Sequence, residues 1–278
     1  MKIGGSTRVF AVLGDPVAHS LSPIMHNLWL SRAGIDAVYV ALRASEEGLP
    51  SFAHWGLAGA NVTAPFKASA VRSATSLSKE AARLGAVNTL RRDENGAWHG
   101  ENTDGAGFVL GLDHAFPGWK AKCQTALVLG AGGAGRAIAW GLAGAGLAKI
   151  VIANRSFARA QAGAASLGIE ALDWERAAQF APRADLIINA THKDVPIEAL
   201  EPILAAAPAK AIACDALYRP RLTPFLLAAQ RKGMVCVDGL FMLAGQGALA
   251  FAHWFDILPD QQLARAAMLQ ALGEEETQ

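Results

Sequence analysis

The sequence of 278 residues contains only three cysteines and almost equal numbers of basic and acidic side chains. Cys123, Cys214 and Cys236 lie far apart and form no C-x-x-C pair, so neither a disulfide framework nor a zinc site is expected. Such cysteine usage is typical of reducing compartments, and we expect a cytoplasmic protein. Twenty-five basic side chains against 24 acidic ones leave a net charge of +1, which predicts binding to neither nucleic acid nor acidic membranes.

Uninterrupted apolar segments are also short. The best candidate for a membrane span, Gly239 to Phe255, is interrupted by Gln246 and His253 and falls below the about 20 residues required. The first apolar run ends before Asp15, too early for an export signal. The seven histidines show no H-E-x-x-H or H-x-H spacing, so we expect no metal. What is present, 52% hydrophobic residues and 28 glycines, indicates a large core with many tight turns.

The pattern of apolar and turn residues predicts an α/β protein of two domains. The first hundred residues predict strands at 8–13, 38–42 and 60–63. A helix is expected from Ser22 to about Ala33, with Ser22 as its N-cap. A hairpin is expected from 86 to 100, with Asn95-Gly96 forming a type I′ turn.

From Thr125 onwards the sequence alternates regularly between strands and helices, which is typical of a Rossmann-type doubly wound parallel sheet. The predicted strands are 125–129, 149–153, 186–189, 211–214 and 234–237, with an edge strand near 169–172. Two final helices, 240–254 and 261–272, are expected to pack on the first domain. The predicted domains are therefore residues 1–105 with 240–278, and residues 106–239.

A glycine-rich turn connects strand 125–129 to the next helix. Gly130, Gly132 and Gly135 have the G-x-G-x-x-G spacing. The first glycine allows the tight turn, the second lets a pyrophosphate approach the backbone, and the third brings the helix close to the strand. Free N–H groups at the helix start favour an anion. We therefore predict a dinucleotide site here, which includes Ala131 and Gly133.

The next strand predicts which dinucleotide is bound. An NAD site usually has Asp or Glu at this strand end for the ribose 2′-hydroxyl, yet no acidic residue occurs from His114 to Ile169. Asn154, Arg155 and Ser156 stand there instead, with Arg159 one helical turn later. Arg155 and Arg159 could be ordinary surface charges, but a guanidinium also pairs bidentately with a 2′-phosphate. The missing acid favours NADP over NAD.

Polar side chains concentrate at strand ends of the first domain, where open α/β sheets bind ligands. Each has a structural explanation of its own; for example, Lys67 and Asp104 could form an exposed ion pair worth little. Together they supply hydroxyls, amides, one lysine and one aspartate, which suits a small polyhydroxylated carboxylate. These residues are Ser20, Ser22, Asn61, Thr63, Lys67, Asn88 and Asp104.

The sequence resembles the shikimate dehydrogenase family along nearly its whole length. The shared segments are residues 14–23, 61–67, 85–89, 102–105, 130–135, 154–156, 215–223 and 239–246. The resemblance implies an NADP-dependent oxidoreductase, a shikimate dehydrogenase, that reversibly reduces 3-dehydroshikimate to shikimate in aromatic amino acid (chorismate) biosynthesis. It also implies a substrate-binding catalytic domain made of both chain ends and a separate NADP-binding domain.

The resemblance further implies roles for single residues. Ser20 and Ser22 would hold the carboxylate, helped by Tyr218. The ring hydroxyls would be bound by Thr63, Asn88, Asp104 and Gln246, with Asn61 nearby. Thr191 and Gly239 would belong to the cofactor side. Lys67 and Asp104 would form the catalytic pair.

A free lysine, with a pKa of about 10.4, is a poor base at neutral pH. Lys67 therefore either has a lowered pKa and accepts the proton, or stays charged and stabilises an alkoxide while Asp104 relays the proton.

Two departures from the family pattern leave alternatives open. Phe66 stands where the family commonly has His, and His192-Lys193-Asp194 replaces small residues. The alternatives are a quinate/shikimate or aminoshikimate dehydrogenase paralogue and a non-catalytic NADP-binding regulator. Quinate enzymes often favour NAD, against which Asn154-Arg155 argues. We expect a small-molecule substrate and a monomer or homodimer.

Overall fold

The computed structural model describes residues 3–47 and 55–274, which form two compact units. Unit 1 contains residues 1–103 and 246–278, and unit 2 contains residues 104–245. The ends of the predicted first domain, residues 1–2 and 275–278, lie outside the described ranges, as do residues 48–54. The sequence predicts divisions after residues 105 and 239, whereas the contacts divide the chain after residues 103 and 245.

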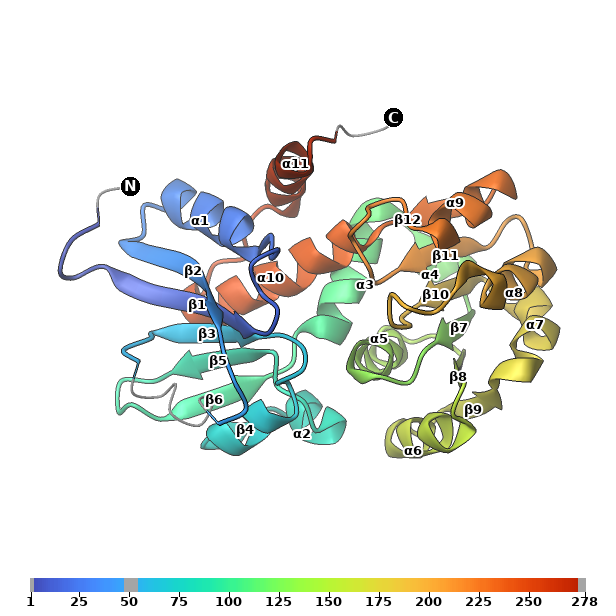
Figure 1. The fold of residues 1–278 in the computed structure, drawn as a ribbon, viewed down its shortest axis with the longest axis horizontal. Helices are drawn as coiled ribbons and strands as arrows, with labels where there is room; N and C mark the ends of the chain where they lie inside the picture. Colours follow the sequence, from blue (N-terminus) through green and yellow to red (C-terminus); the bar gives the residue numbers. More distant parts are fainter. Residues whose placement is uncertain (1–2, 48–54, 275–278) are drawn as a thin grey trace. The chain divides into compact units, whose positions relative to one another are not determined.

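Unit 1 is built on a mixed six-stranded sheet with the strand order β2-β1-β3-β5-β6-β4. Strands β1, β2 and β3 are parallel, whereas β5 is antiparallel to both β3 and β6. The ends of β1, β3 and β6 and the start of β5 therefore lie along one edge of this sheet (Figure 1). The strands are β1 Arg8–Gly14, β2 Ala37–Arg43, β3 Gly59–Val62, β4 Ser76–Leu77, β5 Thr89–Arg92 and β6 Trp98–Glu101.

Helices from both ends of the chain cover this sheet. Helix α1 (Ser22–Arg32) packs on α11 (Gln261–Leu272), and Trp29 Nε1 donates to the Asp260 carbonyl over 2.8 Å. The second half of α10 (Gly239–Phe255) brings Phe255 to 5.0 Å from the ring of Phe10 in β1. Within the described part of unit 1, two further short helices are η2 Ser69–Ser73 and α2 Lys79–Leu84.

Two local predictions in unit 1 are wrong. Leu21, not Ser22, occupies the N-cap position of α1, and no side chain caps the first turn of this helix. The hairpin turn is not type I′, because only Gly96 has a positive φ, at 84°. The Asp93 carboxylate accepts from the backbone N–H groups of Asn95 and Ala97, each over 2.9 Å, and closes a longer loop.

Unit 2 contains the predicted doubly wound sheet, which confirms the fold class. Six parallel strands have the order β12-β11-β10-β7-β8-β9. They are β7 Thr125–Leu129, β8 Lys149–Asn154, β9 Glu170–Asp173, β10 Leu186–Asn189, β11 Ile212–Asp215 and β12 Val235–Val237. The helices are α3 Asp104–Ala115, α4 Trp119–Lys122, α5 Gly133–Gly144, α6 Phe157–Leu167, η3 Trp174–Arg176, α7 Ala177–Phe180, η4 Ala181–Arg183, η5 Ile197–Ala199, α8 Glu201–Ala206 and α9 Pro224–Arg231.

Both faces of the unit 2 sheet are buried, because successive side chains of a strand point to opposite faces. Leu127 and Leu129 belong to a core cluster with residues of α7, α8 and α9. Ala126 and Val128 belong to a second cluster, with residues of α3, α4 and α5. Helices lie on both sides of these strands (Figure 1). This arrangement explains why β7 is a continuous apolar run in the sequence.

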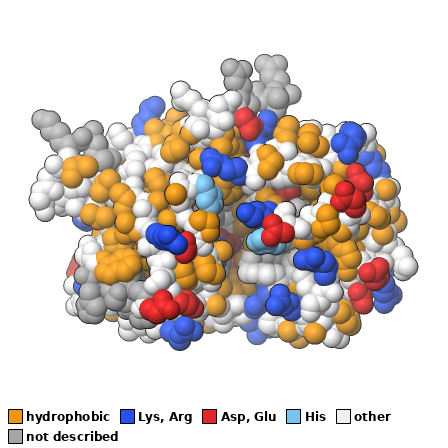
Figure 2. Space-filling view, viewed as in Figure 1, with side chains coloured by type: hydrophobic (Ala, Val, Ile, Leu, Met, Phe, Trp, Pro, Cys, Tyr) orange, Lys and Arg blue, Asp and Glu red, His pale blue; other side chains and the backbone are white. Residues whose placement is uncertain are grey.

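The surface carries charges of both signs side by side. Figure 2 shows this interspersion on one face. Elsewhere in the described residues, ion pairs include Lys149–Glu170 (2.9 Å) and Lys120–Asp113 (3.0 Å). No helix in the described residues is long and apolar enough to cross a membrane. Residues 3–47 and 55–274 also contain no cluster of three or more His, Cys, Asp or Glu able to hold a metal ion.

Candidate functional site

The predicted polar residues of unit 1 gather at the sheet edge where β1 and β3 end. The two strand ends approach closely: a Cβ on Gly14 would lie 2.3 Å from Thr63 Cγ2. After β1 the chain passes through Ser20, whose hydroxyl accepts from the Ser22 backbone N–H over 3.2 Å. Ser22 is buried at the first position of α1, whereas Ser20 is partly exposed. Ser22 therefore begins a helix beside this edge and Ser20 immediately precedes its N-cap, and the backbone N–H groups of a helix start favour a carboxylate.

Asn61, near the end of β3, is held on three sides. Its amide group donates to the Asn88 carbonyl over 3.1 Å and to Thr89 Oγ1 over 3.0 Å. Its carbonyl oxygen accepts from the Tyr39 hydroxyl over 2.7 Å. Asn61 is only 6% exposed. Since both amide hydrogens are used, Asn61 can offer an incoming ligand only a remaining lone pair.

Asn88, before β5, is tied to the residue that precedes Asp104. Its carbonyl oxygen accepts from the Thr103 backbone N–H over 2.8 Å, and its amide group donates to Thr103 Oγ1 over 2.9 Å. The Thr103 hydroxyl in turn donates to the Gln246 carbonyl over 3.0 Å. Asn88 and Gln246, far apart in sequence, are therefore brought together at one edge of unit 1.

Lys67 ends the loop that follows β3. Its carbonyl accepts from the Val87 backbone N–H over 2.8 Å, which fixes the loop beside the strand that leads to Asn88. The Lys67 side chain is partly exposed. Phe66, the departure from the family pattern, is 4% exposed and belongs to the hydrophobic core with Leu13 and Leu90. The core thus accommodates the large apolar side chain at this position.

Asp104 is the first residue of α3 and opens unit 2. Glycine contacts fix this helix: a Cβ on Gly105 would lie 2.2 Å from the Ala137 carbonyl of α5. Gly245 of α10 approaches α3 equally closely, since a Cβ added at Gly245 would lie 2.1 Å from the Gly107 carbonyl oxygen. These contacts explain why the first turns of α10 belong to unit 2. The pairing of Lys67 with Asp104 stays a prediction.

The glycine loop of unit 2 follows β7, and each of its three glycines has a different role. Gly130 has a φ of 108° and lies against the Ala190 backbone, so any side chain there would clash. A Cβ on Gly135 would lie 1.9 Å from the Gly130 carbonyl, so helix α5 packs directly on the turn. Gly132 and Gly133 are exposed, and a Cβ on either would meet no described atom within 4 Å. The exposed stretch at the α5 N-terminus offers its backbone to an anion.

The end of β8 lies directly beside the glycine loop. The Asn154 carbonyl oxygen accepts from the Ala131 backbone N–H over 3.2 Å, and its amide group donates to the Ser156 carbonyl over 3.1 Å. Arg155, Ser156 and Arg159 are exposed around the start of α6. Asn154 therefore shapes the loop, while the two arginines present positive charge beside it.

A buried network at the ends of β10 and β11 supports the last predicted residues. The Asp215 carboxylate accepts from Asn189 Nδ2 over 3.0 Å, from Thr223 Oγ1 over 2.6 Å and from the Leu217 backbone N–H over 2.9 Å. Burial raises the pKa of Asp215 to about 6, against the opposing effect of these three donors. Asn189 also accepts from Thr191 Oγ1 over 2.6 Å. The network thus anchors the loops that carry Thr191 and Tyr218.

The remaining residues of this region line the same loops. Tyr218 is partly buried, and this burial raises its pKa, with Arg219 acting in the opposite direction. A Cβ on Gly239 would lie 2.5 Å from the Leu217 carbonyl, so α10 begins close to the Tyr218 loop. His192 Nδ1 lies 2.9 Å from Asp194 Oδ2, and both side chains are exposed.

Sequence reasoning missed the residues that support the site. Tyr39 and Thr103 connect the residues of unit 1, and Asn189, Asp215 and Thr223 connect those of unit 2. Asp215 and Thr223 stand in one of the shared segments, so a signal existed for them. Tyr39 lies within the apolar run of β2 and is indistinguishable there from a core residue.

Comparison with known proteins gives consistent results across the chain. The family model of the shikimate dehydrogenase substrate binding domain matches residues 12–90, and that of shikimate / quinate 5-dehydrogenase matches residues 113–214. A protein of Brucella canis named shikimate dehydrogenase (NADP(+)) is 41% identical over 263 residues, which are 89% of each chain.

Solved structures extend this likeness to the fold. A shikimate 5-dehydrogenase of Thermus thermophilus, in complex with NADP(H) and shikimate, is 38% identical with a TM-score of 0.84 and covers 95% of this chain and 99% of its own. A quinate dehydrogenase of Corynebacterium glutamicum, in complex with NAD, is 28% identical with a TM-score of 0.84. It covers 95% of this chain and 99% of its own.

Proposed function

The chain belongs to the shikimate dehydrogenase family, and we propose that it catalyses the reversible, NADP-dependent reduction of 3-dehydroshikimate to shikimate. The observation that carries this proposal is that one chain contains both a hydroxyl- and amide-lined sheet edge, in unit 1, and a glycine loop followed by arginine instead of an acid, in unit 2. This reaction belongs to aromatic amino acid (chorismate) biosynthesis.

Unit 1 binds the substrate in this proposal. The hydroxyls of Ser20 and Ser22 donate to the carboxylate, and Tyr218 assists from unit 2. Thr63, Asn88 and Gln246 exchange hydrogen bonds with the ring hydroxyls. Asn61 keeps a single lone pair for the ligand, so its main contribution is to hold the strand ends of unit 1 together.

Unit 2 holds NADP, and its residues fit that group. The open backbone at Gly132 and Gly133 and the α5 N-terminus suit a pyrophosphate. Arg155 and Arg159 suit a 2′-phosphate, which an acid at the same strand end would repel. Thr191 and Gly239 complete the cofactor side. NADPH, when bound, supplies the hydride for reduction of the ketone.

Lys67 and Asp104 transfer the proton that accompanies hydride transfer. During reduction, a donor must protonate the oxygen of the developing alkoxide, and during oxidation an acceptor must remove the same proton. In one arrangement the Lys67 Nζ atom exchanges this proton itself. In the other, Lys67 stays charged and stabilises the alkoxide while the Asp104 carboxylate relays the proton. Both arrangements require Lys67 at the reacting oxygen.

A cytoplasmic location and a monomeric or homodimeric state belong to the same proposal. All three cysteines are free thiols, and burial raises the pKa of Cys123 and Cys236 to about 11. Unreactive, unpaired thiols suit a reducing compartment.

The test is a spectrophotometric panel at a wavelength where NADPH absorbs, crossing shikimate, quinate and aminoshikimate with NADP⁺ and NAD⁺. We expect the highest kcat/KM with shikimate and NADP⁺. Turnover of quinate or aminoshikimate alone would assign the chain to a paralogous activity. Binding of NADP⁺ without turnover of any of these acids would indicate a non-catalytic regulator.

A further inference from the structure

We propose that Ser76, His99 and Asp93 form a second reactive site in unit 1, in which Ser76 is a nucleophile toward aryl esters of carboxylic acids. The three side chains come from β4, from β6 and from the loop after β5. They are not among the residues that the proposed dehydrogenase reaction uses. This site is therefore independent of that reaction and adds an acyl transfer to the chemistry of the chain.

Two hydrogen bonds connect the three side chains in a row. The Ser76 Oγ atom lies 2.6 Å from His99 Nδ1, and His99 Nε2 lies 2.9 Å from Asp93 Oδ2. A hydroxyl in contact with a base, which a third group orients, is the arrangement that activates a serine. The strands enforce this contact, because Ser76 of β4 pairs directly with His99 of β6.

The Asp93 carboxylate decides which nitrogen of His99 carries the hydrogen. An ionised carboxylate only accepts, so His99 Nε2 donates to Asp93. In the neutral imidazole Nδ1 is then the acceptor, and the Ser76 hydroxyl donates to it. His99 is thus held in the tautomer that removes the proton of Ser76. The order of the groups is that of a Ser-His-Asp triad, with the roles of the two ring nitrogens exchanged.

Asp93 is fixed by more than its contact with His99. Its other carboxylate oxygen accepts from the backbone N–H groups of Asn95 and Ala97, each over 2.9 Å. The hydrogen bonds from His99 and from the Ala97 backbone lower the pKa of Asp93, so its carboxyl group is ionised at neutral pH. The hairpin loop therefore holds the orienting group in place before any ligand binds.

The site is accessible and has a cationic neighbour. Ser76 is exposed, and the His99 and Asp93 side chains are 31% and 27% exposed. Arg91 of β5 pairs with His99 of β6, so these two side chains lie on the same face of the sheet. A guanidinium in this position suits the oxyanion that forms when a hydroxyl attacks a carbonyl carbon.

An open cavity of about 1250 Å³ in unit 1 adjoins the site and indicates the class of ester. Arg91 and Asp93 belong to its lining, as do Trp254 and Phe255 at the end of α10. The aromatic side chains suit an aryl group. An aryloxide is also a good leaving group, which an exposed site requires because water weakens the electrostatic stabilisation of the transition state.

The reaction balances with water as the second reactant. The Ser76 Oγ atom forms a bond to the ester carbonyl carbon while His99 Nδ1 takes the hydroxyl proton. The bond to the aryloxide breaks, and the proton passes from His99 Nδ1 to the leaving oxygen. Water then attacks the acyl-Ser76 ester with His99 as its base and releases the carboxylic acid. No group is oxidised or reduced.

The test incubates the full chain with 4-nitrophenyl acetate and follows acetylation of the Ser76 peptide by mass spectrometry. We expect acetyl on Ser76 in wild type. His99→Gln should slow its appearance about 10²-fold, within the usual contribution of a positioned base. Asp93→Asn should act in the same direction, because an amide that donates to Nε2 favours the opposite tautomer of His99. Circular dichroism checks that each variant is folded.

Ser31→Ala is the matched control for Ser76→Ala, because Ser31 is an exposed serine on α1 of the same unit. Ser76→Ala should lose the acetylated peptide and release less 4-nitrophenolate, whereas Ser31→Ala should behave as wild type. Wild type without acetyl on Ser76, or acetylation of Ser76 that His99→Gln leaves unchanged, would overturn the proposal. Shikimate turnover has no part in these outcomes, so the two proposed functions fail separately.

A second measurement needs no variant. Phenylmethylsulfonyl fluoride should sulfonylate Ser76, forming the bond from Oγ to sulfur and releasing fluoride, while His99 takes the proton. Wild type treated in this way should no longer acquire acetyl at Ser76. An unmodified Ser76 peptide after this treatment would contradict its activation by His99.

Discussion

Asn154 and Arg155 are neighbours in the chain with separate tasks. Asn154 bonds to the glycine loop and to the start of α6, so its side chain is committed to the protein itself. Arg155 is exposed beside that loop. The sequence alone predicts that these residues stand at the end of the strand, because that position follows from the β-α-β pattern. The hydrogen bonds of the Asn154 side chain to the glycine loop and to Ser156 could not be predicted, because they depend on where the loop backbone lies.

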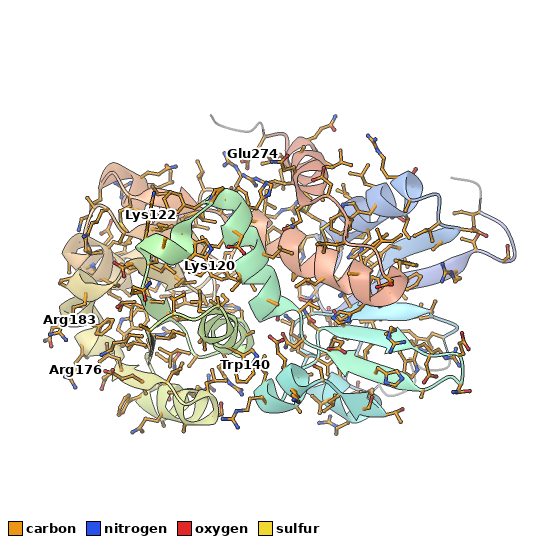
Figure 3. All side chains as sticks on the ribbon, turned by 180° about the vertical axis from the view of Figure 1, so that it is seen from behind. Lys120, Lys122, Trp140, Arg176, Arg183 and Glu274 are labelled. Carbon is orange, nitrogen blue, oxygen red and sulfur yellow. The ribbon has the colours of Figure 1, made fainter. Side chains whose placement is uncertain are left out.

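Arg155→Ala should weaken NADP⁺ binding and leave NAD⁺ binding nearly unchanged. The loss should be about 1–3 kcal/mol, the size of one charge-assisted contact with a phosphate. Calorimetric titration with both dinucleotides measures it. Arg183→Ala is the matched control, because Arg183 lies on η4, before the amino-terminal end of β10, whereas Arg155 follows the carboxyl-terminal end of β8, and the Arg183 side chain points outward (Figure 3). Equal losses for both dinucleotides would show that Arg155 does not read the 2′-phosphate.

Asp215 predicts a pH dependence of stability. Its pKa is raised from 3.8 to about 6, so the folded protein holds this proton more tightly than the unfolded chain does. The contribution of this protonation to stability is complete below pH 3.8 and is lost as the pH rises through 6. Between these values the free energy of unfolding should decline by up to about 1.4 kcal/mol per pH unit on account of this group.

Asp215→Asn should abolish that decline, since an amide does not titrate. Urea unfolding of wild type and variant from pH 4 to pH 7 provides the difference at each pH. Thr223→Val should keep the decline, because it removes a donor and retains the carboxyl group. A wild-type minus Asp215→Asn difference that is flat across this range would contradict the assignment.

At the scale of elements, the strands of unit 2 were predictable and the connections of unit 1 were less so. Strands β7 and β10 have the predicted bounds because both faces of that sheet are buried and each strand is a short apolar run. Helix α1 begins at Ser22 as predicted, but its N-cap is Leu21, and the hairpin turn was wrong because the Asp93 carboxylate closes a longer loop by accepting from backbone N–H groups. Which side chain bonds to which backbone group depends on the folded chain and not on a local sequence pattern.

Helix α3 depends on backbone contact with α5, and Gly105→Ala tests it. The new Cβ would lie 2.2 Å from the Ala137 carbonyl, so one helix must move. We expect the free energy of unfolding to decline by about 1–3 kcal/mol. Gly144→Ala, in the last turn of α5, is the control: its Cβ would meet no described atom within 4 Å, and it should raise stability by about 0.5–1 kcal/mol. Chemical denaturation that finds the two variants alike would contradict this packing.

For the molecule as a whole, the sequence predicted two units and the return of the last helices to the first one. The predicted divisions differ from those of the structure by two and six residues, because α3 and the first turns of α10 pack against each other through Gly107 and Gly245. Hydrophobic periodicity shows that a helix has an apolar face but not which neighbour covers it. The residues of the proposed reaction come from both units, with Lys67 in one and Asp104 in the other.

The most direct test of the proposed chemistry is shikimate-dependent NADP⁺ reduction by wild type, Lys67→Ala and the control Lys79→Ala, which replaces an exposed lysine of unit 1. Wild type and Lys79→Ala should turn over alike. Lys67→Ala should lose about 10²- to 10⁴-fold in kcat, the usual worth of a proton-transferring group, with a much smaller change in KM and unchanged NADP⁺ binding. A Lys67→Ala enzyme with wild-type kcat would contradict the account.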